Sequence, residues 1–141
     1  MAQPRVLSAS GALSGVDHER FAPNELMHEA VFANVVLTAQ DVPQNFATWV
    51  KGWGGECRLE VTLTARLLAQ KRILVTVNGK LFEGDSEATT DLAEEKEASA
   101  IVPRGQPIPF TMTLYNSGFL GGGGDSGTIS LTFINTIVEE D

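Results

Sequence analysis

The sequence is short of cysteine, aromatic residues and long apolar runs, and each shortage excludes a class of protein. Its single cysteine, Cys57, cannot form an intramolecular disulfide, so the chain is not a disulfide-stapled secreted scaffold. No segment approaches the roughly 18–20 consecutive apolar residues that cross a bilayer as a helix, and the N-terminus lacks the apolar stretch of a secretory signal. We therefore expect no membrane insertion and, by default, a cytoplasmic protein, with export left open.

Basic residues are outnumbered by acidic ones. Lysine and arginine total 10 against 18 aspartates and glutamates, which gives a formal net charge of −8. The acids concentrate in residues 83–97 and in the tail, residues 139–141. A protein of this charge is repelled by nucleic acids and by anionic membrane surfaces. Nucleic-acid binding is therefore not expected.

The clearest pattern in the sequence is the alternation of apolar and polar residues between Arg58 and Gly84. Apolar side chains recur at every second position, namely Leu59, Val61, Leu63, Ala65 and Leu67, then Ile73, Val75, Val77 and Leu81. Alternation with period two indicates antiparallel strands with one buried face, joined here by a polar turn at residues 69–72. We interpret Asn78-Gly79 as a bulge or bend rather than a hairpin turn, because only a short arm follows it.

Further short strands are predicted along the rest of the chain. The β-branched or alternating segments are residues 31–39, 98–102, 110–115 and 128–135. Residues 1–15 are predicted to form an edge strand or an arm, and residues 23–30 one or two helical turns or an irregular loop. Because no long helices alternate with the strands, the pattern predicts an all-β fold. We expect a single-domain antiparallel β-sandwich over residues 1–141, with six to eight strands wired as a jelly roll or Greek key.

Few residues could support catalysis. Cys57 is interpreted as a small buried residue at the start of a strand, since no histidine is close to it in sequence. Gly-Asp-Ser-Gly at residues 124–127 resembles a serine-hydrolase fragment, but Ser126 would need His18 or His28 beside it. The acids near these histidines are predicted to be solvated loop residues: Asp17, Glu19, Glu25 and Glu29. The sequence therefore predicts a protein that is not an enzyme.

The acidic segment offers oxygen ligands between two strands. Asp85, Glu87 and Asp91 are candidate calcium ligands, because calcium prefers carboxylate and carbonyl oxygens gathered in loops. The alternative is a solvated connection without a ligand. Trp49 and Trp53 would share one face of a strand, either as a stacking platform for a carbohydrate or as part of the core. One functional hypothesis is therefore a calcium-dependent, carbohydrate-binding-like domain.

Basic residues at outward or turn positions suggest a different function. Arg66, Lys71, Arg72 and Lys80 are complementary to the acidic segment and to the acidic tail. Contact between these surfaces on different copies would produce self-association, whereas contact within one copy would only neutralise charge. The sequence favours a non-catalytic structural or protein-interaction module that binds itself or another protein.

Overall fold

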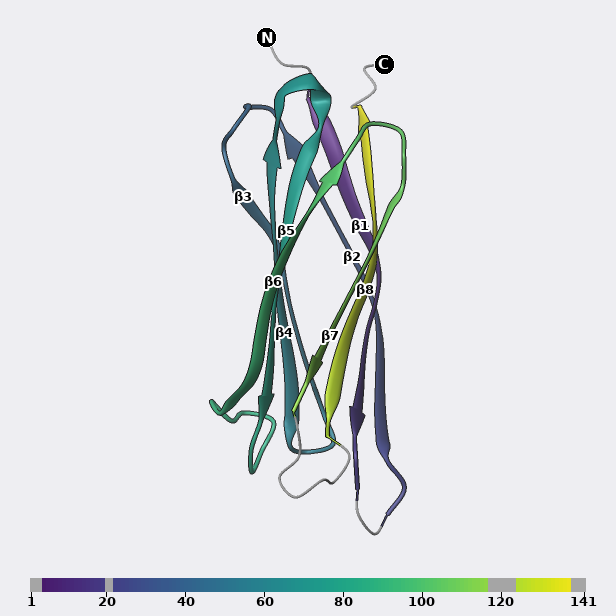
Figure 1. Ribbon diagram of the computed structural model, residues 1–141, viewed down its shortest axis with the longest axis vertical. Helices are drawn as coiled ribbons and strands as arrows, with labels where there is room; N and C mark the ends of the chain where they lie inside the picture. The colour runs from purple at the N-terminus through teal and green to yellow at the C-terminus, as the bar shows by residue number, and fades with distance from the viewer. Residues whose placement is uncertain (1–3, 20–21, 117–123, 138–141) are drawn as a thin grey trace.

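The protein, seen here in a computed structural model that describes residues 4–19, 22–116 and 124–137, is built from eight strands and one short 3-10 turn (Figure 1). The strands are β1 (Arg5–Asp17), β2 (Glu25–Leu37), β3 (Gln44–Trp53), β4 (Cys57–Leu67), β5 (Ile73–Glu83), β6 (Leu92–Val102), β7 (Ile108–Tyr115) and β8 (Ser126–Ile137), with the 3-10 turn η1 (Ala69–Lys71) between β4 and β5. No helix in the described ranges is long and apolar enough to cross a membrane.

The strands form two four-stranded antiparallel sheets packed face to face. Sheet A has the order β2-β1-β8-β7 and sheet B has the order β3-β4-β5-β6. The expected all-β sandwich with six to eight strands is confirmed. Its wiring differs from the expected jelly roll or Greek key, because the chain runs up and down and each strand lies beside its neighbours in sequence (Figure 1). Short connections favour this order, since each strand meets the next before any long crossover is needed.

The predicted pair between Arg58 and Gly84 is confirmed as β4 and β5. Their register is continuous from Cys57 opposite Glu83 to Leu67 opposite Ile73. The interpretation of Asn78-Gly79 as a bend is wrong, because both residues lie within the continuous β4–β5 ladder. Gly79 faces inward instead, where a Cβ atom would crowd Ile129, Leu114 and Met112 of the opposite sheet. Glycine at this position leaves room for the ends of these three side chains between the two sheets.

The inner faces of both sheets form one apolar core. Every second residue of β4 is buried, from Cys57 to Leu67, and the same alternation continues in β5. The largest fully buried side chains come from both sheets: Phe133, Leu7, Leu13, Leu37, Leu59, Leu63, Ile73 and Leu81. Burying each such aliphatic or aromatic side chain contributes about 1.5–3 kcal/mol.

Three segments differ from the predictions. β1 lies between β2 and β8, so residues 5–15 belong to an inner strand and not to an edge strand or arm. Residues 25–30 begin β2 rather than forming helical turns. The acidic residues 92–97 belong to β6, an edge strand whose side chains are mostly exposed. The alternation that identifies a half-buried strand is absent there, because little of β6 faces the core.

Side chains close the two seams where the edges of the sheets meet. At the β6–β7 seam, Glu94 Oε1 accepts a hydrogen bond from the Tyr115 amide at 3.0 Å, and Lys96 Nζ donates one to the Thr113 carbonyl at 2.8 Å. At the β2–β3 seam, Lys51 Nζ lies 3.4 Å from Glu29 Oε2. Covering an edge strand in this way blocks pairing with other chains.

Candidate functional sites

Both ends of the sandwich carry polar side chains at positions that strand alternation directs inward. In β1, Arg5 and Asp17 stand at opposite ends of the strand. Both occupy positions whose side chains face the core, as those of Leu7 and Leu13 do. Asn135, near the end of β8, and Glu83, at the end of β5, also stand at inward-facing positions of their strands. Strand geometry therefore places polar groups at both ends of an apolar core.

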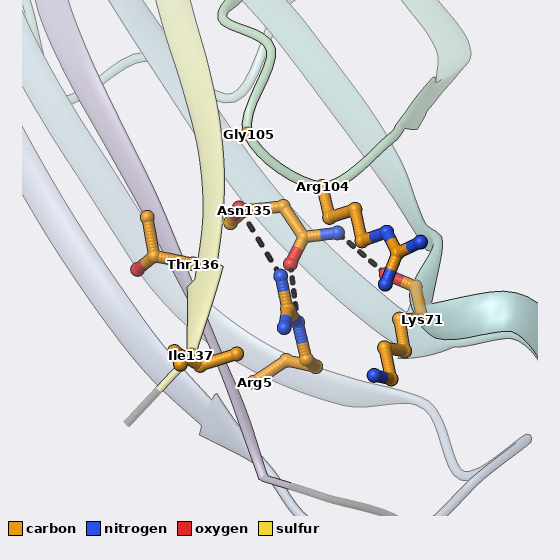
Figure 2. A pocket seen from close by; sticks show the side chains of 7 residues that line it. All are labelled: Arg5, Lys71, Arg104, Gly105, Asn135, Thr136 and Ile137. Carbon is orange, nitrogen blue, oxygen red and sulfur yellow. Dashed lines mark hydrogen bonds between the residues drawn. The ribbon is translucent and has the colours of Figure 1, made fainter. Parts of the chain in front are cut away.

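The first site is a pocket at the end of the sandwich where β1 begins and β8 ends. This basic pocket has a volume of about 520 Å³ and is lined by Arg5, Lys71, Arg104, Gly105, Asn135, Thr136 and Ile137 (Figure 2). Arg5 and Asn135 come from sheet A, Lys71 from η1, and Arg104 from the connection between β6 and β7. Three cationic side chains thus surround one concave surface.

Asn135 connects the segments that meet at the basic pocket. Its Oδ1 accepts a hydrogen bond from Arg5 Nε at 2.9 Å (Figure 2). Its Nδ2 donates to the carbonyls of Lys71 at 2.7 Å and Val102 at 3.0 Å. Its own carbonyl accepts a bond from the Gly105 amide at 3.1 Å. The side chain is fully buried and its hydrogen-bonding groups are used, so its principal role is structural.

Arg5 is the buried cation of the pocket, with 3% of its surface exposed. Burial lowers the pKa of its guanidinium, and the nearby charge of Arg104 lowers it further. Both effects oppose the charged form, and a bound anion would relieve them. The arrangement could therefore accept an anionic group such as a carboxylate.

The structure separates the four basic residues predicted to bind a partner. Lys71 lines the basic pocket, and Arg72 follows it directly in the same turn. Arg66 and Lys80 face outward from sheet B, where Lys80 stands in register between Glu60 and Glu95. For Lys80 this arrangement favours neutralisation within one copy. Sequence reasoning missed Arg5, Arg104 and Asn135. Arg5 and Asn135 could have been recognised, because they are polar residues at positions where strand alternation directs the side chain toward the core.

The second site is an acidic cluster at the opposite end, formed by Asp17, Cys57, Asp125 and Glu83. Asp17 is the last residue of β1 in sheet A, and Asp125 lies in the β7–β8 connection. Cys57 is the first residue of β4 and Glu83 the last residue of β5, and the two stand opposite each other in sheet B. One ligand atom from each of Asp17, Cys57 and Asp125 lies within 4.8 Å of the other two. Cys57 is fully buried, as predicted, and Asp17 is also buried, so its predicted place in a solvated loop is wrong.

Several polar atoms at the acidic cluster have no hydrogen-bond partner within residues 4–19, 22–116 and 124–137. Asp17 Oδ2 and Glu83 Oε2 are both buried in this state, as is Trp53 Nε1 nearby. The indole of Trp53 covers Gly15, where a Cβ atom would overlap the ring, and Asp17 lies two residues further along β1. Asp125 is better satisfied, because its Oδ1 accepts a hydrogen bond from the His18 amide at 2.8 Å.

Burial and mutual repulsion disfavour the charged forms of this cluster. Burial, followed by the neighbouring Asp125, raises the pKa of Asp17 to about 7. Burial and a hydrogen bond to Asp125 raise the pKa of Glu83 to about 8. Burial also raises the pKa of the Cys57 thiol, with further contributions from Asp125, Asp17 and Glu83. Each group therefore holds its proton more tightly than it would in water.

The predicted calcium ligands do not gather into a comparable group. Asp85, Glu87 and Asp91 are exposed, and the groups of potential ligand atoms found among the described residues do not contain them. Glu87 has a different contact, since its Oε2 accepts a hydrogen bond from the Gly55 amide at 2.8 Å. Its carboxylate fastens the connection between β5 and β6 to the turn between β3 and β4. Sequence reasoning missed the buried acids, which lie close by.

The two tryptophans share the inner face of β3. Trp53 is buried in the core, and Trp49 is partly buried and packs against it. Of the two alternatives, a core role is therefore the one that the structure supports. The catalytic alternative at Ser126 also gains no support among the described residues: the ring of His18 bonds to Asn24, at 3.1 Å, and β1 separates β8 from β2, the strand that carries His28. With neighbouring strands about 4.8 Å apart, these two strands lie about 10 Å apart.

The outer face of sheet A carries no charged side chain in its paired rows. These rows are Val36, Val6 and Thr136; Asn34, Ser8 and Ile134; Phe32, Ser10, Thr132 and Pro109; Ala30, Ala12, Ser130 and Thr111; His28, Ser14, Thr128 and Thr113; and Leu26, Val16, Ser126 and Tyr115. We call this surface the uncharged face. Leu26 is 75% exposed on it, Phe32 63% and Val36 51%.

The outer face of sheet B has a different composition. Its charged residues are Arg58, Glu60, Arg66, Lys80, Glu95 and Glu97. Arg58 has two internal partners: its Nε donates to Glu60 Oε2 at 2.8 Å, and its guanidinium lies 4.3 Å from the centre of the Phe82 ring. Three positive and three negative side chains make this face balanced in charge and strongly hydrated.

Comparison with known proteins gives little further information. No protein-family model matches the chain, and neither does any curated protein. Among solved structures, the chain is similar to the Salmonella SPI-1 type III secretion injectisome secretin InvG (residues 176 to the end, open gate state), with 13% identity and a TM-score of 0.35. The similarity covers 99% of this chain and 62% of that chain. A likeness at this level identifies neither fold nor function.

Proposed function

We propose that the protein is a non-catalytic β-sandwich that self-associates, with two copies meeting through the uncharged face. The observation that supports this proposal is the composition of that face, which combines exposed Leu26, Phe32 and Val36 with small and hydroxyl-bearing residues. Contiguous apolar patches on a protein surface mark sites of interaction, and charged residues are depleted at the centre of interfaces.

The dimensions of the uncharged face suit a protein interface. Four strands spaced about 4.8 Å apart, with rows extending over about ten residues at 3.3 Å each, cover about 600 Å². Two such faces would bury about 1,200 Å² in total, which is at the lower end of the range for specific complexes. Because the same face is present on every copy, a twofold axis can pair it with itself. A second copy is therefore the partner that we propose.

Light scattering coupled to size-exclusion chromatography tests this proposal. Phe32→Glu introduces a carboxylate at the uncharged face, and a twofold axis would bring two of them together in the dimer. Like charges facing each other across an interface cost several kcal/mol, so we expect this variant to be monomeric where the parent is dimeric. Val50→Glu is the matched control, because Val50 is 57% exposed on the other edge strand, β3, in the outer face of sheet B. It should remain dimeric.

A parent protein that stays monomeric across the accessible concentration range would contradict self-association. Dissociation of both variants would contradict the assignment of the interface to sheet A. Salt separates this interface from a contact between the basic residues and the acidic segments. An apolar interface persists at high ionic strength, whereas a contact between Lys71, Arg72 and acidic groups would weaken.

A further inference from the structure

The acidic cluster gathers three carboxyl groups and one thiol at one end of the core. Within the described residues, none of the ion pairs formed by Lys or Arg involves Asp17, Asp125 or Glu83. An isolated carboxylate in an apolar interior costs several kcal/mol unless a counter-charge or hydrogen bonds offset the lost hydration. The opposite end of the sandwich shows that this chain can satisfy buried polar groups when both partners are present, as in the hydrogen bond from Arg5 to Asn135.

Two carboxyl oxygens of the cluster are buried without a hydrogen-bond partner among the residues that the structure describes. Asp17 is 1% exposed, yet its Oδ2 has no hydrogen-bond partner, and the Glu83 Oε2 atom is buried in the same condition. The Asp17 carboxylate packs directly against Gly54, where a Cβ atom would overlap it. Buried oxygens without a partner are rare in native proteins, and an ion is one of the groups that satisfies them.

We propose that Asp17, Cys57 and Asp125, with Glu83 as a fourth ligand, bind one divalent cation of the zinc type between the two sheets. The ligand atoms of the first three residues already lie within 4.8 Å of one another. Around tetrahedral zinc, with bonds of about 2.0 Å to oxygen and 2.3 Å to sulfur, ligand atoms lie about 3.3–3.5 Å apart. Small side-chain rotations would therefore close the site.

The chemistry of the donors favours zinc over calcium. Zinc takes four ligands and accepts both thiolate and carboxylate, which matches three acids and one cysteine. Calcium requires six to eight oxygens, more than this cluster offers. The cation would replace the protons that burial now holds on these groups, and the Cys57 thiol would lose its proton to solvent on binding.

Thermal unfolding of metal-free protein with added zinc, calcium or magnesium tests the proposal. A cation that binds only the folded state raises the melting temperature, by about 5–10 °C at a hundredfold excess over Kd. We expect this rise with zinc. Cobalt(II) should produce the intense near-ultraviolet absorption of a cobalt–thiolate bond, and zinc should slow the reaction of Cys57 with a thiol reagent.

Variants assign the response to named residues. Cys57→Ser should abolish the cobalt–thiolate absorption, and Asp125→Asn should greatly weaken the rise in melting temperature with zinc. Asp85→Asn is the matched control, because it removes an exposed acid near the same end and should leave the response intact.

Three results would overturn the proposal: no rise with any cation, a rise with calcium alone, or a zinc response that survives both Cys57→Ser and Asp125→Asn. Circular dichroism establishes that each variant is folded. If either variant fails to fold, the cobalt absorption and thiol protection of the parent decide the question.

Discussion

The two ends of this sandwich are built by the same rule and reach opposite outcomes. At each end, strand alternation carries polar residues inward past the last apolar side chain: Arg5 and Asn135 at one end, Asp17 and Glu83 at the other. At the basic end the buried amide of Asn135 uses both its oxygen and its nitrogen in hydrogen bonds. At the acidic end, one buried oxygen each of Asp17 and Glu83 has no hydrogen-bond partner in the part of the chain that the structure describes.

The difference shows that burial of a polar residue does not by itself indicate function. A buried group that is fully hydrogen-bonded stabilises the fold and needs nothing further. A buried group that is unsatisfied must hold a proton, bind a ligand or destabilise the protein. For this reason the acidic cluster is the stronger candidate for a ligand site, even though the basic end holds a pocket of about 520 Å³. Three substitutions test the comparison.

The largest effect is expected from Asn135→Ala at the basic end. This change removes the bonds to Arg5 Nε and to the carbonyls of Lys71 and Val102, and it leaves these buried groups unpaired. We expect the free energy of unfolding to fall by roughly 2–4 kcal/mol, as measured by urea denaturation. Asn34→Ala, at an exposed position on sheet A, is the control and should change it by less than about 0.5 kcal/mol. Equal effects of the two substitutions would show that the basic end is not held by Asn135.

A smaller effect of opposite sign is expected from Asp125→Asn in the presence of a chelator. The amide can still accept the hydrogen bond from the His18 amide, but it no longer repels the charged forms of Asp17 and Glu83. Removing about one pKa unit of repulsion corresponds to about 1.4 kcal/mol, so at pH 9 the metal-free variant should be more stable than the parent. A less stable variant would show that the aspartate is satisfied as it stands.

The same chelated protein should have a characteristic pH dependence. The pKa values of Asp17 and Glu83 are raised to about 7 and about 8 in the folded state, so the folded state retains protons that the unfolded state has lost. The stability that these protons contribute is fully present below about pH 4 and is lost as the pH rises through 7 and 8. We expect the melting temperature to fall between pH 6 and pH 9, and to fall less in Asp125→Asn. A rise over this interval would contradict the burial of these two acids.

The smallest effect is expected from Arg104→Gln. Arg104 is exposed, and its charge disfavours the nearby buried guanidinium of Arg5. Removing that charge should leave the free energy of unfolding within about 0.5 kcal/mol of the parent. A loss as large as that of Asn135→Ala would show that the basic pocket depends on its charges and not on its hydrogen bonds.

The sequence predicted the parts of the fold in which one face of a strand is buried. β4 and β5 were recognised because the inward positions before Glu83 carry no polar side chain and each outward position of β4 is polar. The acidic half of β6 was not recognised, because its side chains face solvent or the β6–β7 seam. Such a strand shows no alternation of apolar and polar residues. The wiring was wrong because strand order depends on which edges meet, and single-strand patterns contain no information about that.

The candidate sites were harder to predict than the fold. Lys71 and Cys57 were singled out, but their neighbours Arg5, Asn135, Asp17 and Asp125 come from distant parts of the chain. In the sequence, strand alternation places four polar residues at inward-facing positions: Arg5, Asp17, Glu83 and Asn135. Only the register between strands shows that they converge in two groups. The exposed acids at Asp85, Glu87 and Asp91 attracted attention because they are close in sequence, which does not require that they be close in space.

The pairing of β1 with β8 has a consequence for the order in which the protein is made. Sheet B consists of four consecutive strands, so a growing chain can complete it as a meander while the ribosome is still translating β7 and β8. Sheet A cannot close until β8, the last strand synthesised, pairs with β1 from Arg5 opposite Ile137 to Val16 opposite Ser126. Until then the edge of β1 that pairs with β8 is exposed and open to pairing with other chains. Both end sites are also incomplete, because Asn135 and Asp125 belong to the final segment.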